Sequence, residues 1–272
     1  MTPEPWDFGE RLSGHRWRAA EPRATLLLQH GYGEYAGRYV DRYHRLIPHL
    51  VERGFDVHAF DTQGHGGSPG ERGLVDVERT VAAHLAARRR LGDRPLFLLG
   101  HSLGGLVTAA SVAREPTGVA GVVLSAPALL IRTNPVLRRL APMLARFAPS
   151  LGVQPPLDPS GISRLEDEVA AYRTDPALYR GKLPALTGAT ALAVSEDGWG
   201  RYPRWDAPTL VVHGDADGFT DPEGSRRFVG AIRSADKELI AVPEGRHELL
   251  NDAGRDRVLA AVLDWLSARA IG

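Results

Sequence analysis

Cysteine is absent from this 272-residue chain. Its absence excludes disulfides, thiolate metal sites, iron–sulfur clusters and a cysteine nucleophile. The chain also lacks any run of about 18 apolar residues, the length that suggests a membrane-spanning helix. Its N-terminus shows neither a basic segment nor an apolar one, so we expect no signal peptide. These absences together predict a cytoplasmic protein.

Net charge is lacking as well, since 33 basic and 33 acidic residues cancel to +0. A balanced chain has no general electrostatic attraction for nucleic acid, so we expect no nucleic-acid partner. The hydrophobic share of 43% and the charged share of 24% are ordinary for a globular protein. The length suits one large α/β domain, or such a domain with an insertion.

Short apolar segments alternate with helical patterns along most of the chain. Strands are predicted at 24–29, 55–60, 95–99, 119–124, 209–213 and 237–242. Helices are predicted at 42–53, 76–91, 103–113, 222–232 and 255–270. Because parallel strands need crossover connections, this alternation predicts an α/β fold with a mostly parallel central sheet and helices on both faces.

The alternation stops between residues 127 and 207, where Pro and Leu are dense and no strand pattern is found. Loops of that length without structure of their own are rare in compact domains. We therefore predict that 127–207 is an inserted helical cap, and that 1–126 and 208–272 form the core.

Ser102 is the candidate nucleophile. The segment from Gly100 to Gly104 reads Gly-His-Ser-Leu-Gly, which matches the G-x-S-x-G nucleophile elbow. In that motif the serine occupies a strained turn between a strand and a helix, and small neighbours allow the turn to close. A predicted strand precedes this segment and a predicted helix follows it, which is the context that the motif requires.

A serine nucleophile needs a base and a group that orients the base, in the chain order Ser, Asp or Glu, His. Only His213 and His247 follow Ser102. His247 is preferred, because it lies in a loop after the last predicted strand, whereas His213 ends a strand. Asp217 is preferred over Asp215 as the orienting acid, since it lies two residues further past the strand end. Aspartate beside glycine, as at position 215, often only stabilises a turn.

The oxyanion of an acyl transfer needs two N–H donors. One is predicted to be the backbone N–H of Leu103, directly after the nucleophile. The other is predicted to come from the loop His30–Glu34, in which two glycines allow close backbone approach; we assign it to the Tyr32 N–H. No metal or organic cofactor is expected, because neither HExxH nor a P-loop is present.

The same loop offers a rival interpretation. Gly31-x-Gly33-x-x-Ala36 fits the dinucleotide fingerprint, with Asp61 at the end of the next predicted strand as the ribose-binding acid. Two features count against it. Glu34 would bring a carboxylate toward the pyrophosphate, and the helical pattern begins only near residue 42, so no helix N-terminus faces the phosphates.

Several segments, in order, resemble the monoacylglycerol lipases and related lysophospholipase-like α/β-hydrolases. They are His30–Tyr39 (HGYGEYAGRY), Asp61–Ser68 (DTQGHGGS), Gly100–Gly105 (GHSLGG), His213–Asp217 (HGDAD) and Gly245–Asn251 (GRHELLN). The resemblance implies an α/β-hydrolase fold, with Ser102, Asp217 and His247 as the catalytic triad and Tyr32 and Leu103 as the oxyanion positions. Tyr35, Gln63 and Leu103 stand where the family usually has histidine, arginine and methionine, and Tyr32 is bulkier than the residue often found there.

We therefore expect a serine hydrolase that cleaves a lipid monoester, such as a monoacylglycerol, through an acyl-enzyme on Ser102. A broader carboxylesterase or lysophospholipase and a non-catalytic ligand-binding relative are the alternatives. Residues 128–150 carry no acid and four arginines: Arg132, Arg138, Arg139 and Arg146. This stretch is interpreted either as a peripheral contact of the cap with an anionic lipid surface or as a cap helix with a solvated arginine face.

Overall fold

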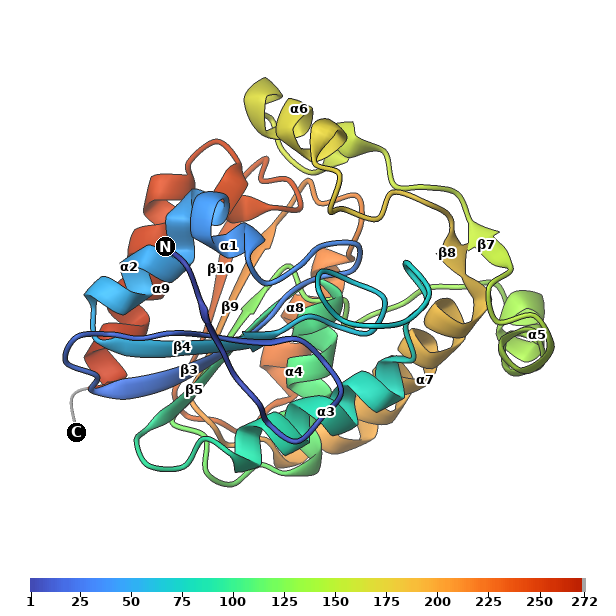
Figure 1. The fold of residues 1–272 in the computed structure, drawn as a ribbon. Coiled ribbons are helices and arrows are strands. Elements are labelled where there is room, and N and C mark those ends of the chain that lie inside the picture. The colour runs from blue at the N-terminus through green and yellow to red at the C-terminus, as the bar shows by residue number, and fades with distance from the viewer. Residues whose placement is uncertain (271–272) are drawn as a thin grey trace.

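The computed structural model describes residues 1–270. An eight-stranded sheet with the order β1-β2-β4-β3-β5-β6-β9-β10 runs through it (Figure 1). The strands are β1 (Glu4–Pro5), β2 (Gly14–Trp17), β3 (Ala24–Gln29), β4 (Phe55–Phe60), β5 (Leu96–His101), β6 (Gly121–Ser125), β9 (Thr209–Gly214) and β10 (Lys237–Val242). The pairings from β4 through β3, β5, β6 and β9 to β10 are parallel, whereas β1 pairs antiparallel with β2 and β2 pairs antiparallel with β4. The predicted mostly parallel sheet is confirmed. The short edge strands β1 and β2 were not predicted.

Helices cover both faces of the sheet. They are α1 (Arg38–Asp41), α2 (Leu46–Glu52), α3 (Val77–Arg89), α4 (Leu103–Arg114), α5 (Pro135–Phe147), α6 (Glu166–Thr174), α7 (Ala185–Arg201), α8 (Pro222–Ala231) and α9 (Arg255–Arg269). Alternate residues of a strand point to opposite faces. Accordingly, Leu26 and Leu28 of β3 pack with α2 and α9, whereas Leu27 packs with α3, α4 and α8. Two hydrophobic cores therefore sandwich the sheet.

The predicted continuous helix over 42–53 is wrong. The structure has α1, a 3-10 turn at Tyr43–Arg45 and then α2, with positive φ at all three residues of the turn. Tertiary hydrogen bonds hold this break: the Tyr43 N–H donates to Asn251 Oδ1, and the buried Tyr43 hydroxyl donates to Glu34 Oε2. Contacts with distant residues therefore override the local helical pattern.

The segment 127–207 contains α5, α6, α7 and a two-stranded antiparallel sheet made by β7 (Gly152–Gln154) and β8 (Leu183–Pro184). The expectation of no strand here is thus wrong, because strands of two or three residues are too short to leave a periodic pattern. α5 continues through Pro142, although proline inside a helix removes one backbone hydrogen bond. α7 packs on α3 and α4, while α5 and α6 lie at the periphery of the molecule.

No helix within residues 1–270 combines the length and the apolar character that crossing a lipid bilayer requires.

Candidate active site

Ser102 occupies a sharp turn between β5 and α4. Its backbone has φ 54° and ψ −119°, in the left-handed half of conformational space that a side chain disfavours. The Ser102 N–H donates to Ser125 O at 2.9 Å. A Cβ on Gly104 would lie 2.3 Å from Gln29 O, and one on Gly100 would lie 2.5 Å from Gly104 O. Glycine at both positions therefore lets strand and helix approach closely enough to form this turn.

Three of the predicted residues meet at the carboxyl ends of the strands. His247 Nε2 lies 2.9 Å from Ser102 Oγ, and His247 Nδ1 lies 2.8 Å from Asp217 Oδ2. Ser102 follows β5, Asp217 follows β9 and His247 follows β10. In a parallel sheet these ends share one edge, and this arrangement brings the side chains together. A proton can pass from the hydroxyl to the imidazole at these distances.

Asp217 is held as a carboxylate. Its Oδ1 accepts the N–H groups of Phe219 and Thr220, and its Oδ2 accepts the Thr220 hydroxyl at 2.7 Å. Burial favours the neutral acid, but the charge of His247 and the hydrogen bonds from His213, His247 and the Phe219 N–H outweigh burial and hold the pKa of Asp217 well below its usual range. By contrast, Asp215 Oδ1 accepts the Glu244 N–H, which is the turn-stabilising role weighed for it from the sequence.

His247 titrates under opposing influences. Burial disfavours its charged form, but the Asp217 carboxylate, supported by Glu248 and Glu34, outweighs burial and raises the pKa of His247 above the ordinary 6.5. A carboxylate in this position stabilises an imidazolium formed on this ring.

The two predicted oxyanion donors line the same cavity as Ser102. Throughout residues 1–270, neither the Tyr32 N–H nor the Leu103 N–H has a hydrogen-bond partner. Buried backbone N–H groups are nearly always paired. A Cβ on Gly31 would come 3.1 Å from Ser102 Cβ, so the loop passes directly beside the serine. Two backbone N–H groups without partners therefore belong to residues that line the cavity beside Ser102.

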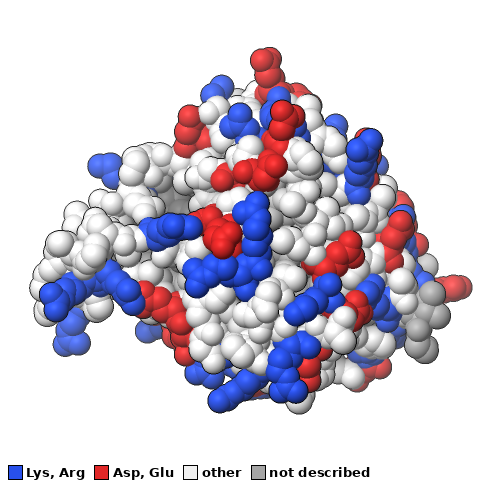
Figure 2. Space-filling model, turned by 180° about the vertical axis from the view of Figure 1, so that it is seen from behind, with Lys and Arg blue, Asp and Glu red and all other residues white. Residues whose placement is uncertain are grey.

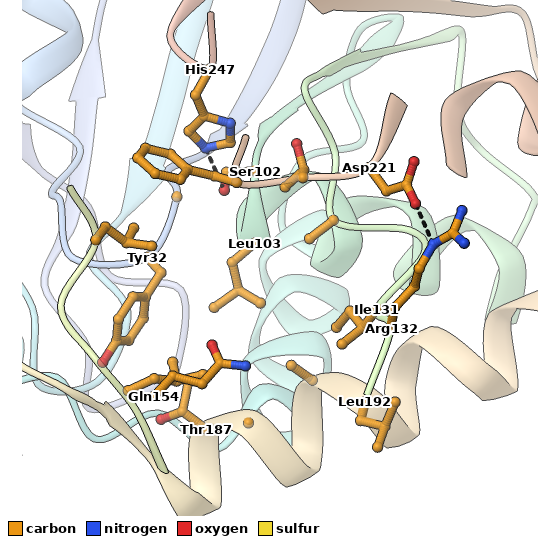
Figure 3. Close-up of a pocket in the computed structure, with 18 of the residues that line it drawn as sticks. Tyr32, Ser102, Leu103, Ile131, Arg132, Gln154, Thr187, Leu192, Asp221 and His247 are labelled. Atoms are coloured by element: carbon orange, nitrogen blue, oxygen red, sulfur yellow. Dashed lines mark hydrogen bonds and ion pairs between the residues drawn. The ribbon is translucent and has the colours of Figure 1, made fainter. Parts of the chain in front are cut away.

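The cavity above Ser102 has a volume of about 540 Å³, within the range of small-molecule sites. It lies between the sheet edge and segment 127–207 (Figure 3). Most of its walls are apolar; the aliphatic residues include Leu103, Leu130, Ile131, Leu137, Leu144, Leu157, Ile162, Leu183 and Leu192. Gln154 and Thr187 are polar exceptions, and Arg132 forms an ion pair with Asp221 at 2.5 Å. Such a cavity suits a long aliphatic chain with a polar end.

Sequence reasoning missed a buried ion cluster beside this site. The Arg38 guanidinium contacts Glu248 through both terminal nitrogens, at 2.7 and 3.0 Å, and contacts Glu34 Oε2 at 3.0 Å. All three side chains are almost fully buried. Glu34 and Arg38 lie in the motif at residues 30–39, but no pattern in the chain indicates that Glu248 is their partner. Across residues 1–270, no group of three or more His, Asp or Glu side chains is arranged to hold a metal ion.

A family model described as serine aminopeptidase, S33, matches residues 20–254. The chain belongs to this family. Among curated relatives of this S33 hydrolase, the monoacylglycerol lipase of Mycolicibacterium smegmatis is 36% identical over 90% of this chain and 89% of its own length. The human monoglyceride lipase is 32% identical over 89% of this chain and 81% of its own length.

Solved structures agree with this membership. The monoacylglycerol lipase of Paleococcus ferrophilus superposes on the S33 hydrolase with a TM-score of 0.87 and 34% identity, covering 96% of this chain and all of the other. A soluble variant of the Saccharomyces cerevisiae monoglyceride lipase in complex with a substrate analog gives a TM-score of 0.80 at 25% identity, covering 99% of this chain and 95% of the other. The predicted α/β-hydrolase fold and the predicted family resemblance are confirmed, and the predicted enzyme class, a carboxylic ester hydrolase, is supported.

Proposed function

We propose that this enzyme hydrolyses monoacylglycerols to glycerol and a fatty acid. The observation that carries the proposal is the relay from Ser102 through His247 to Asp217, set beside two free N–H groups at one end of a largely apolar cavity. The relatives named monoacylglycerol or monoglyceride lipase support the substrate class.

The reaction follows from this geometry. Ser102 Oγ attacks the ester carbonyl while its proton moves to His247 Nε2, and the N–H groups of Tyr32 and Leu103 bind the oxyanion. His247 then protonates the departing glycerol oxygen, and an acyl-enzyme remains on Ser102. Water, deprotonated by His247, attacks the acyl carbon; the Ser102 Oγ–acyl bond breaks and the fatty acid leaves.

Residues 127–207 serve in this proposal as a cap over a core of 1–126 and 208–272. The support is that α5 and the strand β7 contribute cavity walls, for example through Leu137, Leu144 and Val153. The acyl chain lies among these apolar side chains, because each buried methylene contributes about 0.8 kcal/mol to binding. The glycerol end lies toward the polar groups of the wall.

The cap also supplies the proposed contact with a lipid surface. None of the α5 side chains is buried. Val136, Met143 and Phe147 recur at helical spacing, do not line the cavity, and are 68%, 50% and 76% exposed. Within the described chain, Arg132 and Arg138 pair with Asp221 and Glu196, whereas Arg139 and Arg146 have no acidic partner. Basic side chains accompany uncharged surface where α5 protrudes, at the left edge of Figure 2.

A vesicle experiment tests this contact. The protein is sedimented with vesicles of phosphatidylcholine, with and without phosphatidylglycerol. Replacing Val136, Met143 and Phe147 by serine should abolish binding to both vesicle types, because the apolar anchor is lost. The Arg139→Gln, Arg146→Gln variant should lose only the part that phosphatidylglycerol adds. Binding that is absent in the wild type, or unchanged in the serine variant, would contradict the proposal.

Hydrolysis itself is tested with purified wild type and Ser102→Ala on monoacylglycerols, lysophospholipids and p-nitrophenyl esters of several chain lengths. The proposal expects monoacylglycerols to have the highest kcat/KM and the serine variant to be inactive. A preference for lysophospholipids, or an equal rate on all esters, would replace it by the lysophospholipase or broad carboxylesterase interpretation. Tight binding of the lipid without turnover would indicate a ligand-binding protein.

A further inference from the structure

The loop that carries Tyr32 is tied down on both sides of that residue. Within this loop the Gly31 N–H donates to Glu34 Oε1, and Gly31 O accepts a hydrogen bond from His30 Nδ1 at 2.7 Å. The Gly33 N–H donates to His65 Nε2 at 3.0 Å, and Gly33 O accepts from the Tyr179 N–H at 2.7 Å. Every flanking polar group of the backbone is therefore paired, while the Tyr32 N–H stays free.

The two imidazoles act on successive peptide planes. A peptide group is planar, so Gly31 O and the Tyr32 N–H share one rigid plane, and His30 holds it through the carbonyl. The Gly33 N–H belongs to the next plane, which His65 holds. These two planes meet at the Tyr32 Cα, so holding both sets the φ and ψ angles of Tyr32. The Tyr32 N–H lies in the first plane, and these angles fix the orientation of the first plane relative to the second, which His65 anchors.

Both rings must be neutral with the proton on Nδ1. A backbone N–H can only donate, so His65 Nε2 accepts from Gly33 and His30 Nε2 accepts from the Thr62 N–H. The other nitrogen of His65 then donates to Gln63 O at 3.0 Å. Burial lowers the pKa of His65 to about 4, so the His65 ring stays neutral at pH 7.

Packing alone leaves this loop incompletely supported. A void of about 10 Å³ lies behind it, lined by residues that include His30, Tyr32, His65 and Leu103. The atoms that line a void of this size lack packing contacts on the side that faces it. The edge contact between the rings of Tyr32 and His65, with centroids 5.5 Å apart, lies on this side. Hydrogen bonds therefore supply part of the loop's support here, and those of His30 and His65 are among them.

We propose that His65, which lies in the loop after β4 and outside the catalytic triad, is a positioning residue that aims the Tyr32 N–H at the oxyanion. It does so through the Gly33 N–H, while His30 holds the preceding peptide. The inference rests on the proposed function, because it presupposes an oxyanion at this place. It assigns a task to the Asp61–Ser68 motif, which the triad leaves without one.

His65→Leu tests the proposal, because leucine keeps apolar bulk and removes the acceptor. We expect kcat on monoacylglycerol to fall about tenfold to a hundredfold, with KM within about twofold of the wild type, since only transition-state binding is lost. A long-chain trifluoromethyl ketone forms an anionic hemiketal with a reactive serine, and its affinity should fall by the same factor as kcat. The matching carbinol, which cannot be attacked, should bind as before.

Two further variants sharpen the comparison. His65→Gln offers an amide oxygen near the former Nε2 position and should recover part of both losses. His84→Leu is the matched control: His84 is a fully buried histidine on α3 that hydrogen-bonds Ser111 and lies outside the cavity. Its loss should lower the thermal midpoint without changing the ratio of ketone to carbinol affinity.

The outcomes separate the two claims. If the wild type neither turns over ester nor binds the ketone more tightly than the carbinol, the proposed function fails. If the wild type does both and His65→Leu matches it in kcat and ketone affinity, only the positioning role fails. If the variants fail to fold, the imidazole ¹⁵N spectrum of the wild type at pH 7 still tests the proposal. The neutral Nδ1–H tautomer of His65 is expected, and a protonated ring or the Nε2–H tautomer overturns the proposal.

Discussion

His213 Nε2 lies 3.2 Å from Asp217 Oδ2, the same carboxylate oxygen that His247 Nδ1 contacts at 2.8 Å. His213 is the next-to-last residue of β9, and its other ring nitrogen contacts Ser225 Oγ at 2.7 Å. The histidine that the sequence offered as the second candidate base therefore contacts the acid at the same oxygen as His247. It helps to hold the carboxylate in place, and no contact joins it to Ser102.

Asp217→Asn should lower kcat about 10³-fold to 10⁴-fold on any ester, because the amide cannot stabilise the imidazolium or hold the required tautomer of His247. The matched control is Asp215→Asn, which alters only the acceptor of the Glu244 N–H. We expect the control to retain kcat within about threefold, since the turn lies outside the relay. Steady-state kinetics on a p-nitrophenyl ester measure kcat for both variants. Equal losses in the two variants would contradict the assignment of Asp217.

The dependence of kcat/KM on pH should report His247. General base catalysis needs the neutral ring, so the rate rises as pH increases through the pKa of His247. Because that pKa is raised above 6.5, the midpoint of the acid limb should lie above pH 6.5. Asp217 has a lowered pKa and stays ionised across this window. A neutral ester should be assayed from about pH 5 to pH 9; a midpoint of the acid limb below pH 6.5 would count against the relay.

Arg38→Met should lower the free energy of unfolding by about 3–5 kcal/mol, because it leaves Glu34 and Glu248 buried without their cation. Urea unfolding followed by circular dichroism measures the change. The control is Arg18→Met, whose partner Glu4 is half exposed, with 58% and 53% of the two side chains accessible. Exposed pairs contribute little, so this variant should unfold near the wild-type midpoint. Similar midpoints for both variants would show that the Arg38 cluster does not stabilise the fold.

Gly104→Ala should destabilise the protein by at least about 1–3 kcal/mol, since the new Cβ would lie 2.3 Å from Gln29 O and 2.4 Å from His30 O. Relief of these clashes would push β3 and the elbow apart, so kcat should fall as well. At Gly230 on α8, a Cβ meets nothing within 4 Å, and alanine there should stabilise the helix by about 0.5–1 kcal/mol. Thermal midpoints should shift in opposite directions; a shift of the same sign in both would contradict the packing argument.

The fold was predictable where the information is local. Strand β3 and helix α4 show their periodicity within about a dozen residues, and the nucleophile elbow is recognisable from the five residues Gly100 to Gly104. Predictions failed where a distant contact decides the backbone. The turn at Tyr43–Arg45 depends on Asn251 and Glu34, and the strands β7 and β8 form by pairing with each other across 28 intervening residues. In both cases the sequence around one partner gives no indication of where the other partner lies in the chain.

Local spacing and residue chemistry therefore determined the alternation of strands and helices, the position of the nucleophile turn and the short set of candidate acids and bases. The tertiary structure alone decided which aspartate contacts His247, that Glu248 completes the pairing of Arg38, that Arg132 and Arg138 are neutralised while Arg139 and Arg146 are not, and that His65 reaches Gly33. The physical reason is that hydrogen bonds and ion pairs act over about 3 Å. Residues this close in space can be far apart in the chain. Only the packing of the sheet and its helices determines which of them meet.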